Sequence, residues 1–366
     1  MKRIGFVGCG DISGIYLENI TNMFSELEII GVCDLIPQRS ENAAKKYNIK
    51  KVYKDMYELF ADPEVDIVLN ITRPYEHFDV SMAALEAGKN VYSEKPLGAS
   101  FEEARKIRDK ARDKNLIIGG APDTFLGAGI QTCRKLIDEG AIGDVFGASA
   151  YMVCRGHESW HHDPEFYYKY GGGPMMDMGP YYLTALISML GPIKTITGMS
   201  KISMSERLIT SQPFHGTKIK VDVSTYVTGT MCFDSGAIGT IFTTFDVHIA
   251  QVPRIEIYGS EGTLCVPDPN YFEGPVRLHK GGTEGFKEIP LAFDYSENCR
   301  ALGLADMAKA IETGRKARAN GDLTYHVVEV MTGFERASTE RKFIDIESTV
   351  ERPEPMVVPA VKGVLD

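Results

Sequence analysis

The first 120 residues alternate short apolar segments with helical patterns, and this alternation most constrains the possible fold. Predicted strands cover 4–7, 28–33, 67–71, 90–93 and 116–118, and predicted helices cover 15–24, 38–47, 78–87 and 101–114. Strands that alternate with helices pair in parallel through right-handed crossovers. Their continuously apolar character is typical of a sheet covered on both faces. The sequence therefore predicts an α/β fold that begins with a doubly wound parallel sheet.

The pattern changes after about residue 121. Predicted strands rich in β-branched and aromatic residues cover 145–155, 224–233, 239–247, 254–258 and 263–266. Predicted helices cover 129–139, 181–190, 301–318 and 325–341. Strands grouped in one block favour an antiparallel or mixed sheet with helices on one side. We also expect the proline-rich tail, 352–359, to lie extended on the surface.

Length and charge restrict the partners of this chain. Its 366 residues suffice for two domains, and 40 basic against 50 acidic residues give a net charge of -10. That balance disfavours nucleic acid and anionic membrane surfaces, and no apolar stretch reaches the ~20 residues of a membrane span. The seven cysteines are odd in number and form no CxxC pair, which is typical of reduced thiols. We therefore expect a cytoplasmic protein without nucleic-acid or membrane partners.

A glycine-containing turn between the first strand and the first helix predicts dinucleotide binding. Gly8 permits a tight turn, and Gly10 lets the backbone approach a pyrophosphate. Asp11, Ile12 and Ser13 follow, with Ser13 in the position of the third glycine of the usual fingerprint. The start of the helix offers free N–H groups and the positive end of its dipole to the phosphates.

The next strand ends on an acidic residue, Asp34, which lies 24 positions after Gly10. A carboxylate at this place hydrogen-bonds the adenosine ribose and repels a 2′-phosphate, so the sequence favours NAD over NADP. Arg39 keeps the alternative open, because it could stack on adenine or reach a 2′-phosphate.

Two further loops are expected at the same edge of the sheet, because the carboxyl ends of parallel strands form the ligand crevice in such folds. These loops supply the candidate cofactor-binding residues Thr72, Arg73, Pro74, His77, Glu94 and Lys95. Lys95 would face the nicotinamide, and a partly desolvated ammonium can exchange protons with a substrate hydroxyl. The alternative is that Lys95 is an ordinary surface lysine.

Taken in order, these motifs resemble the Gfo/Idh/MocA oxidoreductase family, and the resemblance continues through 136–143, 172–179 and 258–263. It implies a Rossmann domain, here 1–121, followed by an α+β domain, here 122–366, with a large, open and mostly antiparallel sheet. It also implies hydride transfer between a nicotinamide cofactor and a carbinol carbon. The C-terminal sheet of the family often forms oligomer interfaces, so we expect a homo-oligomer, from dimer to hexamer.

The resemblance assigns the candidate catalytic residues. Lys95 matches the catalytic lysine of the family, and Asp177 matches the aspartate of its second-domain motif. Most members carry a histidine four residues later, whereas this chain has Tyr181, and Thr184 stands where a second aspartate is common. A phenol can perform the same proton transfer when a lysine ammonium stabilises its phenolate. We expect Lys95 and Tyr181 to be the acid–base pair. Alternatively, Tyr181 only packs or hydrogen-bonds the substrate, or a histidine of the loop 157–162 is the acid–base in its place.

Substrate contacts are expected from Trp160, His161 and His162, because an aromatic face and polar imidazoles suit a sugar ring. Asp177 and Tyr181 should also touch the substrate. Asp123 lies where the last strand of the first domain leads into the second, and we expect it near the nicotinamide.

A metal site is an alternative interpretation of His157, His161, His162 and Asp163. Their spacing is irregular and the chain has no HExxH motif, so we predict no metal site. Histidines that only cap or pack in a loop are a further alternative.

The predicted function is an NAD-dependent dehydrogenase acting on a secondary hydroxyl of a sugar or glycoside, with C3 of a glucoside within the range of the family. The alternatives are an inositol or cyclitol dehydrogenase and a redox-neutral oxidoreductase that retains its cofactor. A non-catalytic regulator that senses NAD or a sugar is a different class of protein, against which Lys95 and Asp177 argue.

Overall fold

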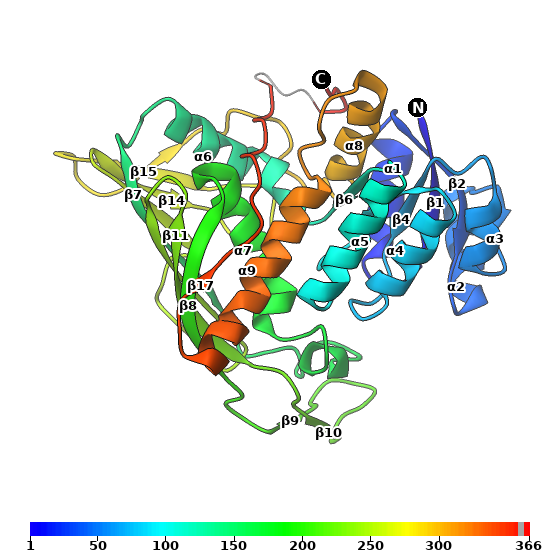
Figure 1. Cartoon of the computed structure of the whole chain (residues 1–366), viewed down its shortest axis with the longest axis horizontal. Coiled ribbons are helices and arrows are strands. Elements are labelled where there is room, and N and C mark those ends of the chain that lie inside the picture. The colour runs from blue at the N-terminus through cyan, green and yellow to red at the C-terminus, as the bar shows by residue number, and fades with distance from the viewer. Residues whose placement is uncertain (358–361) are drawn as a thin grey trace.

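The N-terminal part of the chain forms a six-stranded parallel sheet with connecting helices. Figure 1 shows the computed structural model, which describes residues 1–357 and 362–366. The strands are β1 (Lys2–Val7), β2 (Leu27–Cys33), β3 (Lys51–Val52), β4 (Ile67–Asn70), β5 (Asn90–Ser93) and β6 (Ile118–Gly120). The helices are α1 (Ser13–Asn22), α2 (Pro37–Tyr47), α3 (Met56–Ala61), α4 (His77–Glu86) and α5 (Phe101–Asp113).

The strand order of this sheet is β3-β2-β1-β4-β5-β6, and every pairing is parallel. All residues of β4 are buried, as expected for a strand covered on both faces. In such sheets ligands bind at the carboxyl ends of the strands, where the strand order reverses, which is here between β1 and β4. The predicted doubly wound sheet is confirmed.

The C-terminal part forms a nine-stranded sheet with the order β16-β15-β14-β13-β7-β12-β11-β8-β17. Its strands are β7 (Val145–Val153), β8 (Ile193–Lys201), β11 (Tyr226–Phe233), β12 (Ile238–Thr244), β13 (Ile255–Gly259), β14 (Gly262–Val266), β15 (Val276–Lys280), β16 (Lys287–Ile289) and β17 (Ile344–Asp345). A separate hairpin holds β9 (Glu206–Leu208) and β10 (Lys218–Lys220). Only β7 and β12 pair in parallel within the described sheet, so the predicted mostly antiparallel sheet is confirmed.

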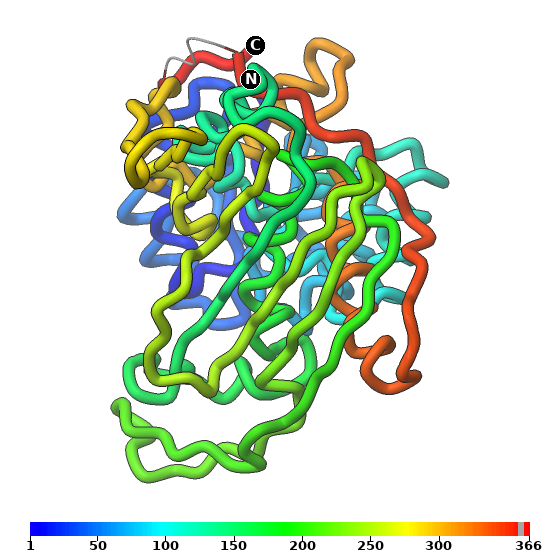
Figure 2. The backbone as a smooth tube through the Cα atoms, turned by 90° about the vertical axis from the view of Figure 1, so that its left-hand side faces the viewer, coloured from blue at the N-terminus to red at the C-terminus, as the bar shows by residue number. Residues whose placement is uncertain are grey.

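Helices cover one face of this sheet and leave the other open, as Figure 2 shows. The helices of this part are η1 (Thr124–Leu126), α6 (Ala128–Asp138), η2 (Glu165–Tyr168), α7 (Pro174–Leu190), α8 (Leu302–Thr313) and α9 (Gly321–Glu340), and α8 packs against β6 of the first sheet. Among them, α7 packs against β7 and β12, and α9 packs against β8.

The start of α7 corrects a prediction, because the helix begins at Pro174 and not at 181. Gly179 and Pro180 resemble helix breakers in the sequence, yet both lie inside the helix. Pro174 suits the first turn, and Gly173 before it has a φ of 89°, which favours glycine. As a result Asp177 lies in the first turn of α7, and Tyr181 lies one turn later.

The chain returns to the first sheet near its C-terminus. In Figure 1, α9 runs between the two sheets, and it contacts α5 and β6 as well as β8. Gly120 N donates to the Ala319 carbonyl at 3.1 Å, which ties the connection between α8 and α9 to β6. A domain boundary at residue 121 stays a prediction, and α9 contacts elements on both sides of it.

The proline-rich tail is extended up to residue 357 but is not confined to the surface. Met356 is only 4% exposed, and its N–H donates to Gln131 Oε1 at 2.8 Å. The tail therefore covers part of α6, and the prediction that it lies on the surface is wrong for this stretch. Residues 358 and 359 of the predicted tail lie outside the described residues.

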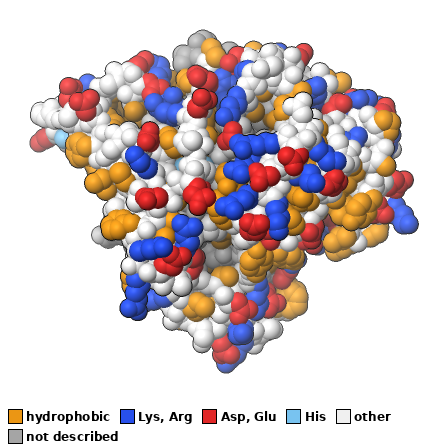
Figure 3. Space-filling view, in the orientation of Figure 1, with side chains coloured by type: hydrophobic (Ala, Val, Ile, Leu, Met, Phe, Trp, Pro, Cys, Tyr) orange, Lys and Arg blue, Asp and Glu red, His pale blue; other side chains and the backbone are white. Residues whose placement is uncertain are grey.

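Charges of both signs are interspersed over α5 and α9 on the face shown in Figure 3. Arg105 lies 3.8 Å from Glu102 and 3.7 Å from Glu347, for example. No helix among the described residues combines the length and the apolar character needed to cross a membrane. The cytoplasmic location stays a prediction.

Candidate active site

The turn between β1 and α1 has the geometry of a dinucleotide cradle. Gly8 has a φ of +96°, and a Cβ there would lie 2.5 Å from the Ile71 carbonyl oxygen, so the turn requires glycine. A Cβ on Gly10 would meet no atom within 4 Å. The chain thus leaves space above Gly10 at the start of α1, where a pyrophosphate can approach the backbone. Asp11, Ile12 and Ser13 lead from this turn into α1.

Asp34 lies against the same turn. Its carboxylate accepts hydrogen bonds from Cys9 N at 2.6 Å and from Ile36 N at 2.8 Å. These bonds hold the acidic side chain at the carboxyl end of β2, where the adenosine ribose is expected. Arg39 is exposed on α2, and its charge acts on Cys9 in the glycine turn, where it partly offsets the rise in the pKa of that thiol caused by burial.

Buried side chains hold the loops that follow β4 and β5. His77 lies between two backbone carbonyls, with Nδ1 2.7 Å from Pro96 O and Nε2 3.0 Å from Thr72 O. Burial lowers its pKa. Glu94 accepts a hydrogen bond from the Tyr16 hydroxyl of α1 at 2.6 Å. Both residues were predicted to bind the cofactor, and in this structure they connect the loops to each other and to α1.

Lys95 and Asp177 meet across the site. Lys95 Nζ donates to Asp177 Oδ1 at 2.8 Å and to the Asp177 carbonyl at 2.7 Å. Burial disfavours the charged ammonium, but the Asp177 carboxylate outweighs this effect and raises the pKa of Lys95 above its usual range. Lys95 is therefore a charged donor near neutral pH, and the interpretation as a free surface lysine is wrong.

Tyr181 lies beside this pair, with Lys95 Nζ 5.1 Å from the centroid of its ring. A second cation, Arg300, interacts electrostatically with the Tyr181 side chain, and no local sequence pattern indicates this neighbour. Burial opposes the charge of Arg300, and the interaction with Tyr181 raises its pKa. A phenol next to two cations is suited to carry negative charge for part of a reaction.

His157 is a further residue of the site, and it is one of the loop histidines that the sequence left open as an alternative acid–base or metal ligand. Its Nε2 lies 3.7 Å from Asp177 Oδ2, and its ring stacks on Tyr167 with centroids 3.7 Å apart. Nδ1 is buried without a hydrogen-bond partner among the described residues. Burial lowers the pKa of His157 to about 4, so its ring is neutral at pH 7.

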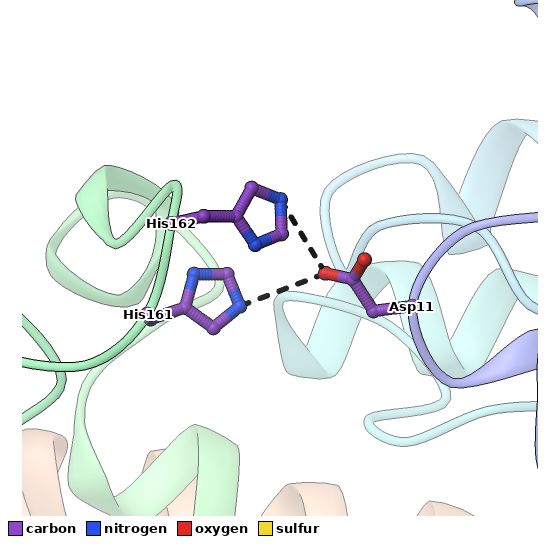
Figure 4. Close-up of side chains that lie close together, drawn as sticks. All are labelled: Asp11, His161 and His162. Carbon is purple, nitrogen blue, oxygen red and sulfur yellow. Dashed lines mark ion pairs between the residues drawn. The ribbon is translucent and has the colours of Figure 1, made fainter. Parts of the chain in front are cut away.

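The predicted substrate histidines face the glycine turn. Figure 4 shows His161 and His162 directed at Asp11, with Nε2–Oδ2 distances of 3.8 and 3.7 Å. Nearby, Arg73 pairs with Asp163 at 2.7 Å. These contacts tie the segment 157–163 to the part of the first sheet that is expected to hold the cofactor. Trp160 is 64% exposed and forms no part of this contact.

The same close approach makes Asp11, His161 and His162 a geometric candidate for metal binding. However, His161 Nδ1 accepts a hydrogen bond from Asp163 N at 3.0 Å. A neutral imidazole that accepts at Nδ1 carries its proton on Nε2, the atom that faces Asp11. The ring is thus arranged to donate towards the carboxylate and has no lone pair directed at a metal.

Asp123 is buried next to the start of α8. It is only 1% exposed, and its Oδ2 accepts a hydrogen bond from Gly303 N at 3.0 Å. Burial raises its pKa to about 6. Asp123 supports the start of α8, and its contact with a substrate stays a prediction.

Comparison with known proteins places the chain in a family. Residues 2–120 match the domain described as "Oxidoreductase family, NAD-binding Rossmann fold", and residues 130–265 match the "GFO/IDH/MocA C-terminal domain". The chain belongs to the Gfo/Idh/MocA oxidoreductase family. It is an oxidoreductase with an NAD-binding domain, which confirms the predicted family, cofactor and enzyme class.

Relatives in this family are identical to this chain at about a quarter of the aligned positions. The chain is 24% identical over 315 residues to scyllo-inositol 2-dehydrogenase (NAD(+)) of Bacillus subtilis, covering 86% of this chain and 87% of that protein. It is 24% identical over 350 residues to myo-inositol 2-dehydrogenase of Thermotoga maritima, covering 95% and 99%. A solved structure of levoglucosan dehydrogenase with NADH and L-sorbose matches with a TM-score of 0.81 at 20% identity, covering 95% and 99%. That structural match shows the common fold.

The two glycines of the turn give a testable contrast. Gly10→Ala is expected to weaken NADH binding by about tenfold or more, because the new methyl group fills space needed by the pyrophosphate. It should change the free energy of unfolding by less than ~0.5 kcal/mol, since the methyl group meets no protein atom. Gly8→Ala should instead destabilise the fold by about 1–3 kcal/mol through backbone strain. NADH fluorescence titration measures the affinity for NADH, and denaturant unfolding measures the free energy of unfolding. Unchanged NADH affinity in Gly10→Ala would contradict this placement of the cofactor.

Proposed function

We propose that this chain oxidises a secondary alcohol of a sugar, glycoside or cyclitol, with NAD as the hydride acceptor. The observation that carries the proposal is the contact between Lys95 and Asp177, with Tyr181 beside it on α7. An ammonium, a carboxylate and a phenol meet at the carboxyl edge of the first sheet, and the glycine turn lies at the same edge. These groups supply proton transfer next to a hydride acceptor.

The three residues have separate roles in the oxidising direction. Tyr181, as its phenolate, accepts the proton of the substrate hydroxyl. Lys95 stays protonated, stabilises the phenolate and donates a hydrogen bond to the substrate oxygen. Asp177 accepts the hydrogen bond that fixes Lys95 Nζ, which keeps the ammonium directed into the site. NAD, when bound, supplies the redox chemistry by taking the hydride from the carbinol carbon.

The proposed substrate class rests on the relatives and on the polar and aromatic groups of the site. The relatives are named for inositols, and the matching structure is a levoglucosan dehydrogenase. Trp160 offers an exposed aromatic face, and His157 offers an imidazole at Asp177. A cyclic polyol of either kind fits these features, so an inositol is as good a candidate as a glycoside oxidised at C3.

The nine-stranded sheet supports a second proposal, which is assembly into a homo-oligomer. Its open face carries exposed apolar side chains, among them Ile238 at 58% and Met199 at 68% exposure. A face of this kind, with no helix over it in Figure 2, is a suitable interface between copies of the chain.

A substrate screen tests the reaction. Inositols, free sugars, glycosides and levoglucosan are each incubated with the enzyme and NAD, and absorbance of NADH at ~340 nm is followed. We expect reduction of NAD with at least one cyclic polyol and none with primary alcohols. Turnover of paired sugars without added NAD would instead favour an oxidoreductase that retains its cofactor, and NADH binding without any turnover across the screen would contradict the proposal.

Substitutions at the site test the roles of the residues. Tyr181→Phe is expected to lower kcat by about 10²–10⁴-fold while NADH binding is kept, and Lys95→Met should have an effect of similar size. Tyr57→Phe, at a 64% exposed position on α3, is the control. His157, whose pKa is lowered to about 4, is the alternative base. In that case activity would fall below about pH 4 as the ring takes up a proton, and His157→Gln would abolish this pH dependence. Full activity in Tyr181→Phe would contradict the proposed acid–base pair of Lys95 and Tyr181.

The oligomer is tested by sedimentation equilibrium. We expect the wild-type chain to be a dimer or larger, and Ile238→Asp to dissociate it by placing a charge in the apolar interface. Tyr57→Asp, which lies outside the nine-stranded sheet, is the matched control. A wild-type monomer at all concentrations would rule out this interface.

A further inference from the structure

The segment 157–171, which leads from β7 to α7, crosses to the carboxyl edge of the first sheet. Figure 4 shows its first contact there, where Nε2 of His161 and of His162 lie 3.8 and 3.7 Å from Asp11 Oδ2 in the turn after β1. The same turn holds Gly10, above which the chain leaves open space. The segment therefore reaches the first sheet directly beside the expected position of the cofactor phosphates.

Further contacts continue along this edge. Arg73 Nη2, in the loop after β4, donates to Asp163 Oδ2 at 2.7 Å, and Arg73 Cζ lies 5.6 Å from the centroid of the Phe166 ring. The Tyr170 hydroxyl donates to Glu103 Oε1 of α5 at 2.9 Å. The strand order reverses between β1 and β4. The segment thus spans the crevice in which folds of this kind bind a dinucleotide.

The other side of the segment is anchored in a buried network. The Glu158 carboxylate accepts hydrogen bonds from Arg207 Nη1 of β9 at 2.9 Å and from the Tyr168 hydroxyl. Ser211, which follows β9, donates through Oγ to the His161 carbonyl at 2.5 Å. The Arg207 side chain is only 1% exposed. Separating a charged pair at this depth leaves an uncompensated buried charge, which is strongly unfavourable.

The contacts with the first sheet are weaker, because they are open to solvent. The Arg73 side chain is 47% exposed, and the Asp11 side chain is 70% exposed. Solvent screening leaves an ion pair at such a position only a small contribution to stability. The segment therefore separates more easily from the first sheet than from the network around Arg207, and it opens on the side of the cofactor.

We infer that the segment 157–171 is a strap that must leave the first sheet before the cofactor can enter or leave. The ion pair between Arg73 and Asp163 is its latch. The inference rests on the proposed function, which requires NAD at the glycine turn, and it adds a control over cofactor exchange. A segment that closes over a reacting cofactor also excludes water from it.

Stopped-flow fluorescence of NADH measures both rate constants of exchange. Asp163→Ala should raise the association and the dissociation rate constants together by about two- to fivefold, as expected from the loss of an exposed ion pair. The dissociation constant should stay nearly unchanged, because a larger open fraction scales both rate constants equally and does not alter the contacts with NADH. Asp163→Glu keeps the charge and should recover most of the wild-type behaviour.

A second variant tests the strap at another contact, and a third serves as the control. Tyr170→Phe removes the hydrogen bond to Glu103 and should also raise both rate constants. Asp222→Ala removes the same charge as Asp163→Ala, from an exposed pair with Lys169 of the same segment at 2.9 Å. Because Asp222 follows β10 and does not touch the first sheet in this pair, its variant should exchange NADH at the wild-type rates.

Thermal unfolding first establishes that the variants are folded. Equal rises of both rate constants in Asp163→Ala and Tyr170→Phe, absent in Asp222→Ala, support the inference. A rise of the dissociation rate constant alone makes Asp163 part of the binding surface and overturns the strap. Unchanged rate constants, or an equal effect in Asp222→Ala, overturn it as well. The measurement needs no turnover, so a failed substrate screen refutes the proposed function and leaves the result on exchange standing.

Discussion

The ion pair between Lys95 and Asp177 is the contact on which the rest of the site depends. The two residues are 82 positions apart, and their atoms meet at 2.8 Å with side chains only 15% and 16% exposed. An ion pair with so little solvent costs desolvation energy, and it is favourable only when the remaining donors and acceptors are satisfied. Lys95 meets this condition by also donating to the Asp177 carbonyl. The pair thereby joins the carboxyl end of β5 to the first turn of α7 and brings Tyr181 to the site.

Burial around this pair determines which of the titratable groups are charged near pH 7. His157 approaches Asp177 from the other side, but burial keeps its pKa at about 4, so the imidazole adds no charge near pH 7. Asp177 is therefore balanced by Lys95 alone. The site holds the carboxylates of Asp177 and Glu94 and the cations Lys95 and Arg300, and both cations interact electrostatically with Tyr181. A neutral His157 remains available to hydrogen-bond a substrate hydroxyl.

Much of the fold could be predicted from the sequence, because it depends on local patterns. Alternating apolar strands and helices predicted the parallel sheet, and Lys95 could be placed at its edge because it directly follows β5. The start of α7 was missed because Pro180 is tolerated inside the helix once Pro174 has begun it. Arg300 and the true environment of Asp123 could not be predicted, since both depend on the turn before α8 returning to the first sheet. Contacts between distant segments have no local pattern, and a buried aspartate looks the same in sequence as an exposed one.

The tyrosine at position 181 changes the charge that the site must stabilise. A histidine base is neutral before it accepts a proton and cationic afterwards, whereas a tyrosine base is anionic before and neutral afterwards. Neighbouring cations therefore favour the working form of a phenol and disfavour the protonated form of an imidazole. Lys95 Nζ lies 5.1 Å from the centroid of the Tyr181 ring, and the charge of Arg300 interacts with the same side chain. Cations beside position 181 therefore suit a tyrosine better than the histidine that the family resemblance led us to expect there.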